Sequence, residues 1–156
     1  MAQLTGPSPF RLDLTPLRYQ FPGNTGDWDA DWLVVKMHAA DGNRDWESVD
    51  PAFLTWELRS LVEWLRALAS GTEGDENWFG CVEPNLQFSA ARDAAGICLR
   101  AVFEQEFRPP GTRIDEPGED EEIEIEFRPS PEQLRRFADQ LDAELEPFPV
   151  RRPLTR

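Results

Sequence analysis

Histidine and cysteine, two residue types that often carry chemistry, are scarce in this 156-residue sequence. Its one histidine, His38, could act as a general base, but a single histidine does not build a multi-histidine zinc site. Because His38 follows Lys36 on an expected strand, we interpret it as an ordinary solvent-facing residue. Cys81 and Cys98 lack the paired spacing of a zinc ribbon. We expect them to be reduced and buried, although neighbouring strands could bring them close enough to bond. The sequence predicts no metal site and no cofactor.

Three carboxylates, those of Asp27, Asp29 and Asp31, resemble the start of a calcium-binding loop. The match ends there, because Trp32 stands where such a loop needs glycine and His38 where it needs a bidentate glutamate. We interpret the segment as a loop entering a strand, with carboxylates that accept hydrogen bonds from local backbone N–H groups. Nothing matches a phosphate-binding glycine loop or a nucleophile elbow, so we expect no catalytic residue. One alternative stays open: a small hydrolase or isomerase that uses Asp29 and Asp31 near His38.

The strongest chemical signal is negative charge. The chain carries 30 acidic and 16 basic residues, a formal net charge of -14, which repels nucleic acid and anionic lipid and favours a basic protein partner. The acids concentrate between Asp115 and Glu126, where no basic residue intervenes. This run is either a solvated loop and strand face that aids solubility or a docking surface for a basic protein. The candidate partner-binding residues are Glu119, Asp120, Glu121, Glu122, Glu124 and Glu126.

Hydrophobic periodicity predicts the elements that position these residues. Alternating apolar residues indicate strands at 10–14, 17–21, 33–39, around Trp46, and at 78–82, 86–91, 97–107 and 123–127. Helical spacing starts at Thr55, with Glu57 on the expected solvent side and Gly71 placed to end the helix. It starts again after Ser130, which is followed by a proline and a capping-box glutamine. On the first helix, Trp56 and Trp64 are interpreted as core or boundary packing. The pattern predicts an α+β fold: an antiparallel sheet of about six strands with two helices packed on one face.

The domain organisation follows from length and composition. We expect a flexible lead-in at 1–9, a single α+β domain at 10–150 and a C-terminal tail at 151–156. No run approaches the ~20 apolar residues of a membrane span. The start of the chain lacks a basic, apolar signal pattern, so a cytoplasmic location is expected. The oligomeric state is not predicted.

A series of short motifs resembles the bacterial WapI-type immunity proteins over residues 10–150. The motifs occur in order at 19–22 (Tyr-Gln-Phe-Pro), 27–33, 50–51, 54–58, 64–65, 83–86 with Phe88, and 148–149. The resemblance implies an antitoxin that binds and neutralises the C-terminal domain of a polymorphic or contact-delivered toxin, commonly a nuclease, without catalysis of its own. The matching positions are turn, strand-entry and helix residues, so the resemblance assigns no contact residue. A scaffold or accessory domain in a larger assembly is a further alternative.

Overall fold

The computed structural model describes residues 1–6, 9–72, 77–112 and 122–151, and the structural statements below concern these residues. Eight strands within them form two antiparallel four-stranded sheets, each a simple meander. The first sheet contains β1 (Ala2–Thr5), β2 (Arg11–Tyr19), β3 (Trp32–Ala40) and β4 (Asp45–Leu54). The second contains β5 (Trp78–Phe79), β6 (Leu86–Asp93), β7 (Gly96–Phe103) and β8 (Ile123–Phe127). The α+β class and antiparallel pairing are confirmed, with the strands divided between two sheets instead of one.

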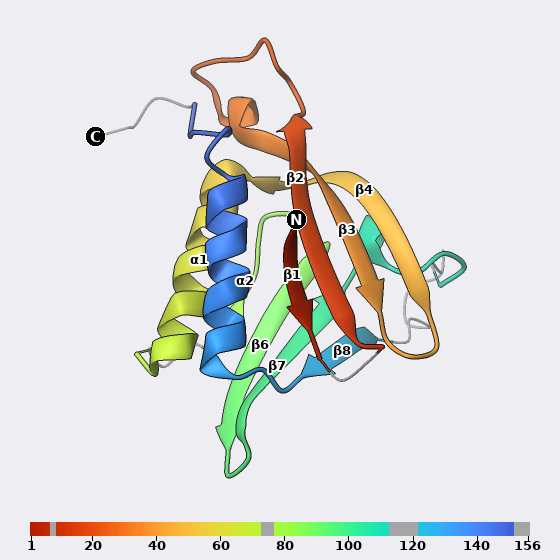
Figure 1. Ribbon diagram of the computed structural model, residues 1–156. Coiled ribbons are helices and arrows are strands. Elements are labelled where there is room, and N and C mark those ends of the chain that lie inside the picture. The colour runs from red at the N-terminus through yellow and green to blue at the C-terminus, as the bar shows by residue number, and fades with distance from the viewer. Residues whose placement is uncertain (7–8, 73–76, 113–121, 152–156) are drawn as a thin grey trace.

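Two helices cover one flank of the sheets. Figure 1 shows α1 (Thr55–Ser70) and α2 (Pro131–Glu144) side by side, with α2 against β1. Gly71 ends α1 in the left-handed conformation that glycine adopts without strain (φ 71°), as its position predicts. The Ser130 hydroxyl accepts from Gln133 N and the Gln133 side chain accepts from Ser130 N, so the predicted capping box is also confirmed. No helix in the described ranges is long and apolar enough to cross a membrane.

One hydrophobic core joins both sheets and both helices. It forms because alternate residues of each strand point inward and the apolar stripe of each helix faces them. Trp46 of β4 and Phe103 of β7 meet edge to face at 5.3 Å between ring centroids, and Trp64 of α1 lies 6.0 Å from Phe79 of β5. The interpretation of Trp64 as core packing is therefore confirmed. With the inner faces filled, the outer face of each sheet is left to contact other molecules.

The N-terminal and C-terminal segments are more ordered than the sequence suggests. The expected lead-in at 1–9 contains β1, which pairs with β2 in the register Ala2↔Leu14 and buries Leu4. Four residues are too few for periodicity to identify a strand, so the pattern missed it. At the other end, Arg151 is anchored: its N–H donates to Asp31 Oδ1 at 2.6 Å and its guanidinium stacks on the Tyr19 ring at 3.6 Å. The expected tail at 151–156 thus begins with a fixed residue, and 152–156 lie outside the described ranges.

The strand boundaries differ from the prediction in four places. The segment expected around Trp46 is the longer strand β4, Asp45–Leu54. β2 is one strand, and a bulge between Pro16 and Arg18 shifts its register, which is why two alternating patterns adjoin there. The expected strand at 78–82 is only Trp78–Phe79. The expected strand at 97–107 ends at Phe103, and a short 3-10 turn, η2 (Gln105–Phe107), follows it. This turn buries Phe107 against Phe53 and brings the Phe107 carbonyl 2.9 Å from Trp46 Nε1.

Candidate functional site

The candidate acidic residues are divided by the limits of the structure. Glu119, Asp120 and Glu121 lie outside the described residues. Glu122 directly precedes β8, and Glu124 and Glu126 lie on it, all three exposed. They alternate with the buried side chains of Ile123, Ile125 and Phe127, as the period-2 pattern predicts. The three candidate residues that the structure describes therefore lie at the solvent side of β8, an edge strand of the second sheet.

Strand register places other side chains beside these glutamates. Trp78 of β5 pairs with Ser89, Ser89 with Arg100, and Arg100 with Glu126. The next row runs Gln87, Val102, Glu124. Since residues of one row share a face of the sheet, these side chains form a single outer surface. We name this surface the acidic face and define it by Trp78, Gln87, Ser89, Arg100, Val102, Glu104, Glu122, Glu124 and Glu126.

Carboxylates outnumber guanidiniums on the acidic face. Arg100 is hydrogen-bonded to Glu124 and lies 3.5 Å from Glu122 Oε1. Its partner Glu124 raises the pKa of Arg100 by that hydrogen bond. At the border of the face, Arg128 lies 3.4 Å from Glu126 and 2.6 Å from Asp93. These pairs are exposed, so they neutralise part of the charge but contribute little stability.

A hollow of about 310 Å³ opens on the acidic face. Its lining combines the apolar groups of Trp78 and Val102 with the charged groups of Arg100, Glu104 and Glu122. Trp78 is 58% exposed, which is high for a residue that is mostly buried in folded proteins. An exposed aromatic ring beside a hollow with charged groups is the usual composition of a protein-binding anchor.

The outer face of the first sheet is organised differently. A hollow of about 350 Å³ there contains Arg11, Asp13 and His38. Asp13 is 2% exposed, and its Oδ2 atom contacts the Arg11 guanidinium and lies 3.3 Å from His38 Nδ1. His38 Nε2 lies 2.5 Å from Asp45 Oδ1. His38 therefore lies on the outer face, as the alternation predicts, but it is not an ordinary exposed residue, because its ring is held between two carboxylates.

The alternative catalytic group does not assemble. Asp29 and Asp31 lie in the short turn η1 (Trp28–Asp31), whereas His38 lies seven residues after Asp31, about 20 Å further along extended β3. Asp31 is fully buried and accepts a hydrogen bond from Arg151 N. The interpretation of this segment as a loop whose carboxylates accept from local backbone N–H groups is confirmed for Asp27, whose Oδ1 accepts from Ala30 N at 2.9 Å, but not for Asp31, whose donor is distant in the sequence. Among the described residues, no group of three or more His, Cys, Asp or Glu side chains is arranged to hold a metal ion.

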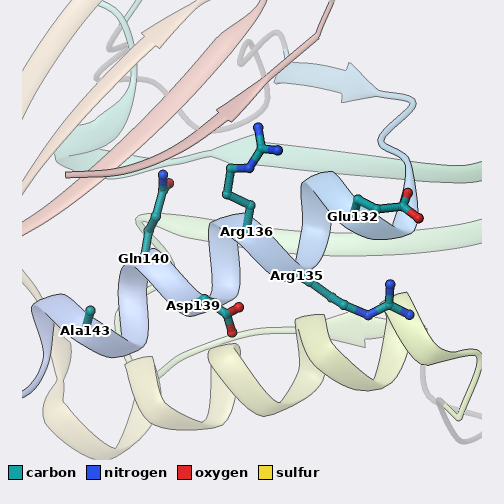
Figure 2. A pocket seen from close by; sticks show the side chains of 6 residues that line it. All are labelled: Glu132, Arg135, Arg136, Asp139, Gln140 and Ala143. Atoms are coloured by element: carbon teal, nitrogen blue, oxygen red, sulfur yellow. The ribbon is translucent and has the colours of Figure 1, made fainter.

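A third depression, broad and shallow, runs along the outer face of α2. Figure 2 shows its side chains, with Arg136 and Gln140 directed away from α1 and Arg135 and Asp139 toward it. Three of the six have structural partners: Gln140 Oε1 accepts from Gln3 N, Arg135 donates to the Ala69 carbonyl and Asp139 accepts from Arg66. This surface therefore joins α2 to β1 and α1, and it is a weaker candidate than the acidic face.

The two cysteines are free, as expected, but half-buried instead of fully buried. Burial, followed by the charge of Glu57, raises the pKa of Cys81 well above its usual range. Burial and a hydrogen bond with Glu126 raise the pKa of Cys98. Both thiols therefore stay protonated near neutral pH and are poor nucleophiles.

The motifs of the family resemblance contact one another. Tyr19 donates from its hydroxyl to the Pro149 carbonyl at 2.6 Å, and its ring meets Phe148 edge to face at 5.4 Å. Trp28 and Trp56 form a second aromatic pair, also at 5.4 Å. These contacts join segments that are far apart in the sequence, so these residues stabilise the fold and lie apart from the acidic face.

Buried polar residues of the motifs serve the same purpose. Asn85 donates to Asp50 at 2.9 Å. Glu57, which the helical pattern assigns to the wet side of α1, is only 4% exposed: its Oε1 accepts from Leu54 N and its Oε2 from Val82 N. The carboxylate thus caps α1 and fixes the loop after β5, which explains its burial.

Comparison with known proteins identifies the class of the chain. The model of the immunity protein WapI-like family matches residues 3–149. The chain belongs to this family. None of the curated proteins and none of the solved structures compared with the chain gives a significant match.

Proposed function

We propose that this protein is an immunity protein that binds a cognate bacterial toxin domain and neutralises it by covering the toxin's active site or substrate groove. The match of residues 3–149 to the immunity protein WapI-like family carries this proposal. The action is one of occupancy in the cytoplasm of the producing cell, without chemistry on the partner. A nuclease is the toxin class that suits the charge best, because a nuclease presents a basic groove to its nucleic acid substrate.

The acidic face supports the choice of a basic partner. The exposed glutamates of this face belong to a chain whose formal net charge is -14, so the chain attracts a basic protein before contact. Complementary fields raise association rate constants to ~10⁸–10⁹ M⁻¹s⁻¹ at low salt. Fast capture suits an antitoxin, since a free toxin damages the cell until it is bound.

The decisive experiment is rescue by co-expression. The C-terminal domain of a large secreted repeat protein encoded beside this gene would be expressed from an inducible promoter, with and without this protein. We expect growth arrest with the toxin domain alone and growth with both. A toxin domain from an unrelated locus provides the matched control and should kill in both cases. Failure of the protein to rescue, with both partners expressed and soluble, would contradict the proposal.

A further inference from the structure

We propose that the hollow beside Trp78 is an anchor pocket that receives an arginine side chain of the basic partner. This inference rests on the proposed function, because it names the group through which the partner is held after capture. Charge complementarity argues for a cationic occupant, and the shape and lining of the hollow argue for arginine in particular.

The position of Trp78 makes its ring available to a partner. β5 places Trp78 opposite Ser89 on the outer face, whereas the next residue, Phe79, points inward to the core. The Trp78 side chain therefore gains little from the fold, and 58% of its surface remains exposed. A planar guanidinium stacks on an indole ring and keeps its N–H donors in the ring plane, free to reach acceptors at the edge.

The acceptors at the edge are Glu104 and Glu122. The Glu122 side chain is 60% exposed and lies 3.5 Å from Arg100, at the limit of a hydrogen bond. The Glu104 carboxylate lies 3.9 Å from Arg108, whose guanidinium donates to the Thr112 carbonyl. An ionised carboxylate accepts several hydrogen bonds, so both glutamates have capacity for a partner's N–H groups.

Lysine and apolar side chains fit the hollow less well. An ammonium is a compact, strongly hydrated charge that can lie over the indole by cation–π attraction, but it lacks the planar group that stacks on the ring while donating sideways to both carboxylates. An apolar side chain would displace water from the carboxylates without replacing their hydrogen bonds. The hollow on the first sheet is a contrasting case, because Arg11 contacts a carboxylate, Asp13, that is almost fully buried. Beside Trp78, Arg100 is hydrogen-bonded to Glu124, whereas Glu122 and Glu104 remain exposed to a partner.

Gly80 controls the position of the Trp78 ring. A Cβ atom added at Gly80 would lie 2.4 Å from the Cζ2 and Cη2 atoms of Trp78, far inside van der Waals contact. The substitution Gly80→Ala therefore must displace the indole while keeping it in the protein. This variant separates the place of the ring from the mere presence of a tryptophan.

The first test uses short peptides and does not need the toxin. Acetyl-Gly-Arg-Gly-amide, its lysine analogue and its neutral citrulline analogue would be titrated into the isotope-labelled protein, with the indole N–H signal of Trp78 as the NMR readout. We expect the arginine peptide to shift that signal saturably, the lysine peptide to bind at least threefold more weakly, and citrulline to leave it unchanged. Equal shifts with all three peptides, or none with any, would overturn the proposal.

The second test uses the toxin domain that the protein rescues. We expect Trp78→Ala to raise the dissociation constant on the order of 100-fold, mainly through faster release, as is typical of an anchor residue. Gly80→Ala and Glu104→Gln should each raise it on the order of 10-fold. Trp28→Ala is the matched control, because Trp28 is 47% exposed but lies in η1, away from the acidic face. It should leave the constant unchanged.

The outcomes separate the two proposals. If the wild-type protein rescues and the three variants bind like wild type, the anchor pocket is wrong and the proposed function stands. If the wild-type protein does not rescue, the proposed function is wrong, whereas the peptide titration still tests the hollow. Denaturant unfolding of each variant verifies that it is folded, and Gly80→Ala keeps the test valid if Trp78→Ala is not.

Discussion

The outer faces of the two sheets have similar hollows but opposite charge organisation. On the first sheet, Asp13 is buried between Arg11 and His38, and His38 also contacts Asp45. On the second sheet, Glu104 and Glu122 are exposed at the edge of a hollow that contains an exposed tryptophan. On the first face a buried carboxylate holds two basic partners, whereas on the second face the ion pairs, such as that of Arg100 with Glu124, are exposed to solvent.

On the proposed function, this difference separates a face that stabilises the fold from a face that binds the partner. A charge that is desolvated on folding must be paired within the chain, and removing its partner leaves it unsatisfied. A charge that stays hydrated costs little to keep and retains its field for a partner. Substitutions on the first face should therefore change the free energy of unfolding, and those on the second face should change the kinetics of association.

The largest expected stability effect comes from Asp13→Ala. Removing this carboxylate leaves the Arg11 guanidinium and the His38 ring without their shared acceptor, so we expect the free energy of unfolding to fall by about 2 kcal/mol. Denaturant titration followed by tryptophan fluorescence measures it. Asp13→Asn keeps an acceptor oxygen, so it should lower the free energy of unfolding by less. A wild-type unfolding free energy, or a slower association with the toxin domain, would contradict the division between the faces.

The next effect concerns the charge of the acidic face. Replacing Glu122, Glu124 and Glu126 together by Gln removes three exposed charges without changing side-chain shape. We expect the association rate constant at low salt to fall on the order of 10-fold, with a smaller change in the dissociation rate constant. Stopped-flow mixing at several salt concentrations would show the difference shrinking as screening increases.

The matched control for that variant lies on the first sheet. Glu47 is exposed and pairs with Lys36 at 3.5 Å, so Glu47→Gln removes one hydrated charge from the opposite kind of face. Its effect on association should be close to none, and its effect on stability below about 1 kcal/mol. If Glu47→Gln lowers the association rate constant as much per charge removed as the triple variant does, then net charge alone steers the partner. The acidic face is in that case not its docking surface.

The sequence predicts the faces of single elements well and the pairing between elements poorly. The alternation of Glu and Ile in 123–127 places Glu124 and Glu126 in solvent because period-2 geometry is local. The sequence did not single out Trp78 and Glu104 of the proposed anchor pocket, because their neighbours depend on strand register, which no local pattern specifies. The division into two sheets is nonlocal for the same reason. The available signal was a tryptophan on an expected strand, two residues before Gly80.

Buried polar groups were the second source of error. The helical period assigns Glu57 to the solvent side of α1, and a glutamate is expected there because charged side chains are mostly exposed. The structure overrides both, because two backbone N–H groups that would otherwise be unsatisfied donate to this carboxylate. His38 shows the same effect. The alternation along β3 places it correctly on the outer face, but its carboxylate partners lie on β2 and β4, so the sequence of β3 does not predict them.

The smallest prediction uses Cys98 as a reporter within the second face. Cys98 lies on β7, is half-buried and pairs with Ala91 of β6. Glu126 contributes to the raised pKa of the Cys98 thiol by a hydrogen bond and by its charge. Glu126→Gln removes that charge, so the pKa should fall, the thiolate fraction at pH 8.5 should rise, and alkylation by iodoacetamide should become a few-fold faster. Mass spectrometry of the labelled peptide measures the rate.

Cys81 is the internal control for the same experiment, because burial and Glu57 raise its pKa and neither changes in the Glu126 variant. Its slow labelling should stay constant. Binding of the toxin domain should then protect Cys98 in the wild-type protein, since Cys98 lies beside Glu126 at the border of the acidic face. Protection means that the partner covers the face whose charge attracts it. Labelling of Cys98 at the same rate in the free and bound protein would place the toxin elsewhere and would reduce the acidic face to a source of long-range attraction.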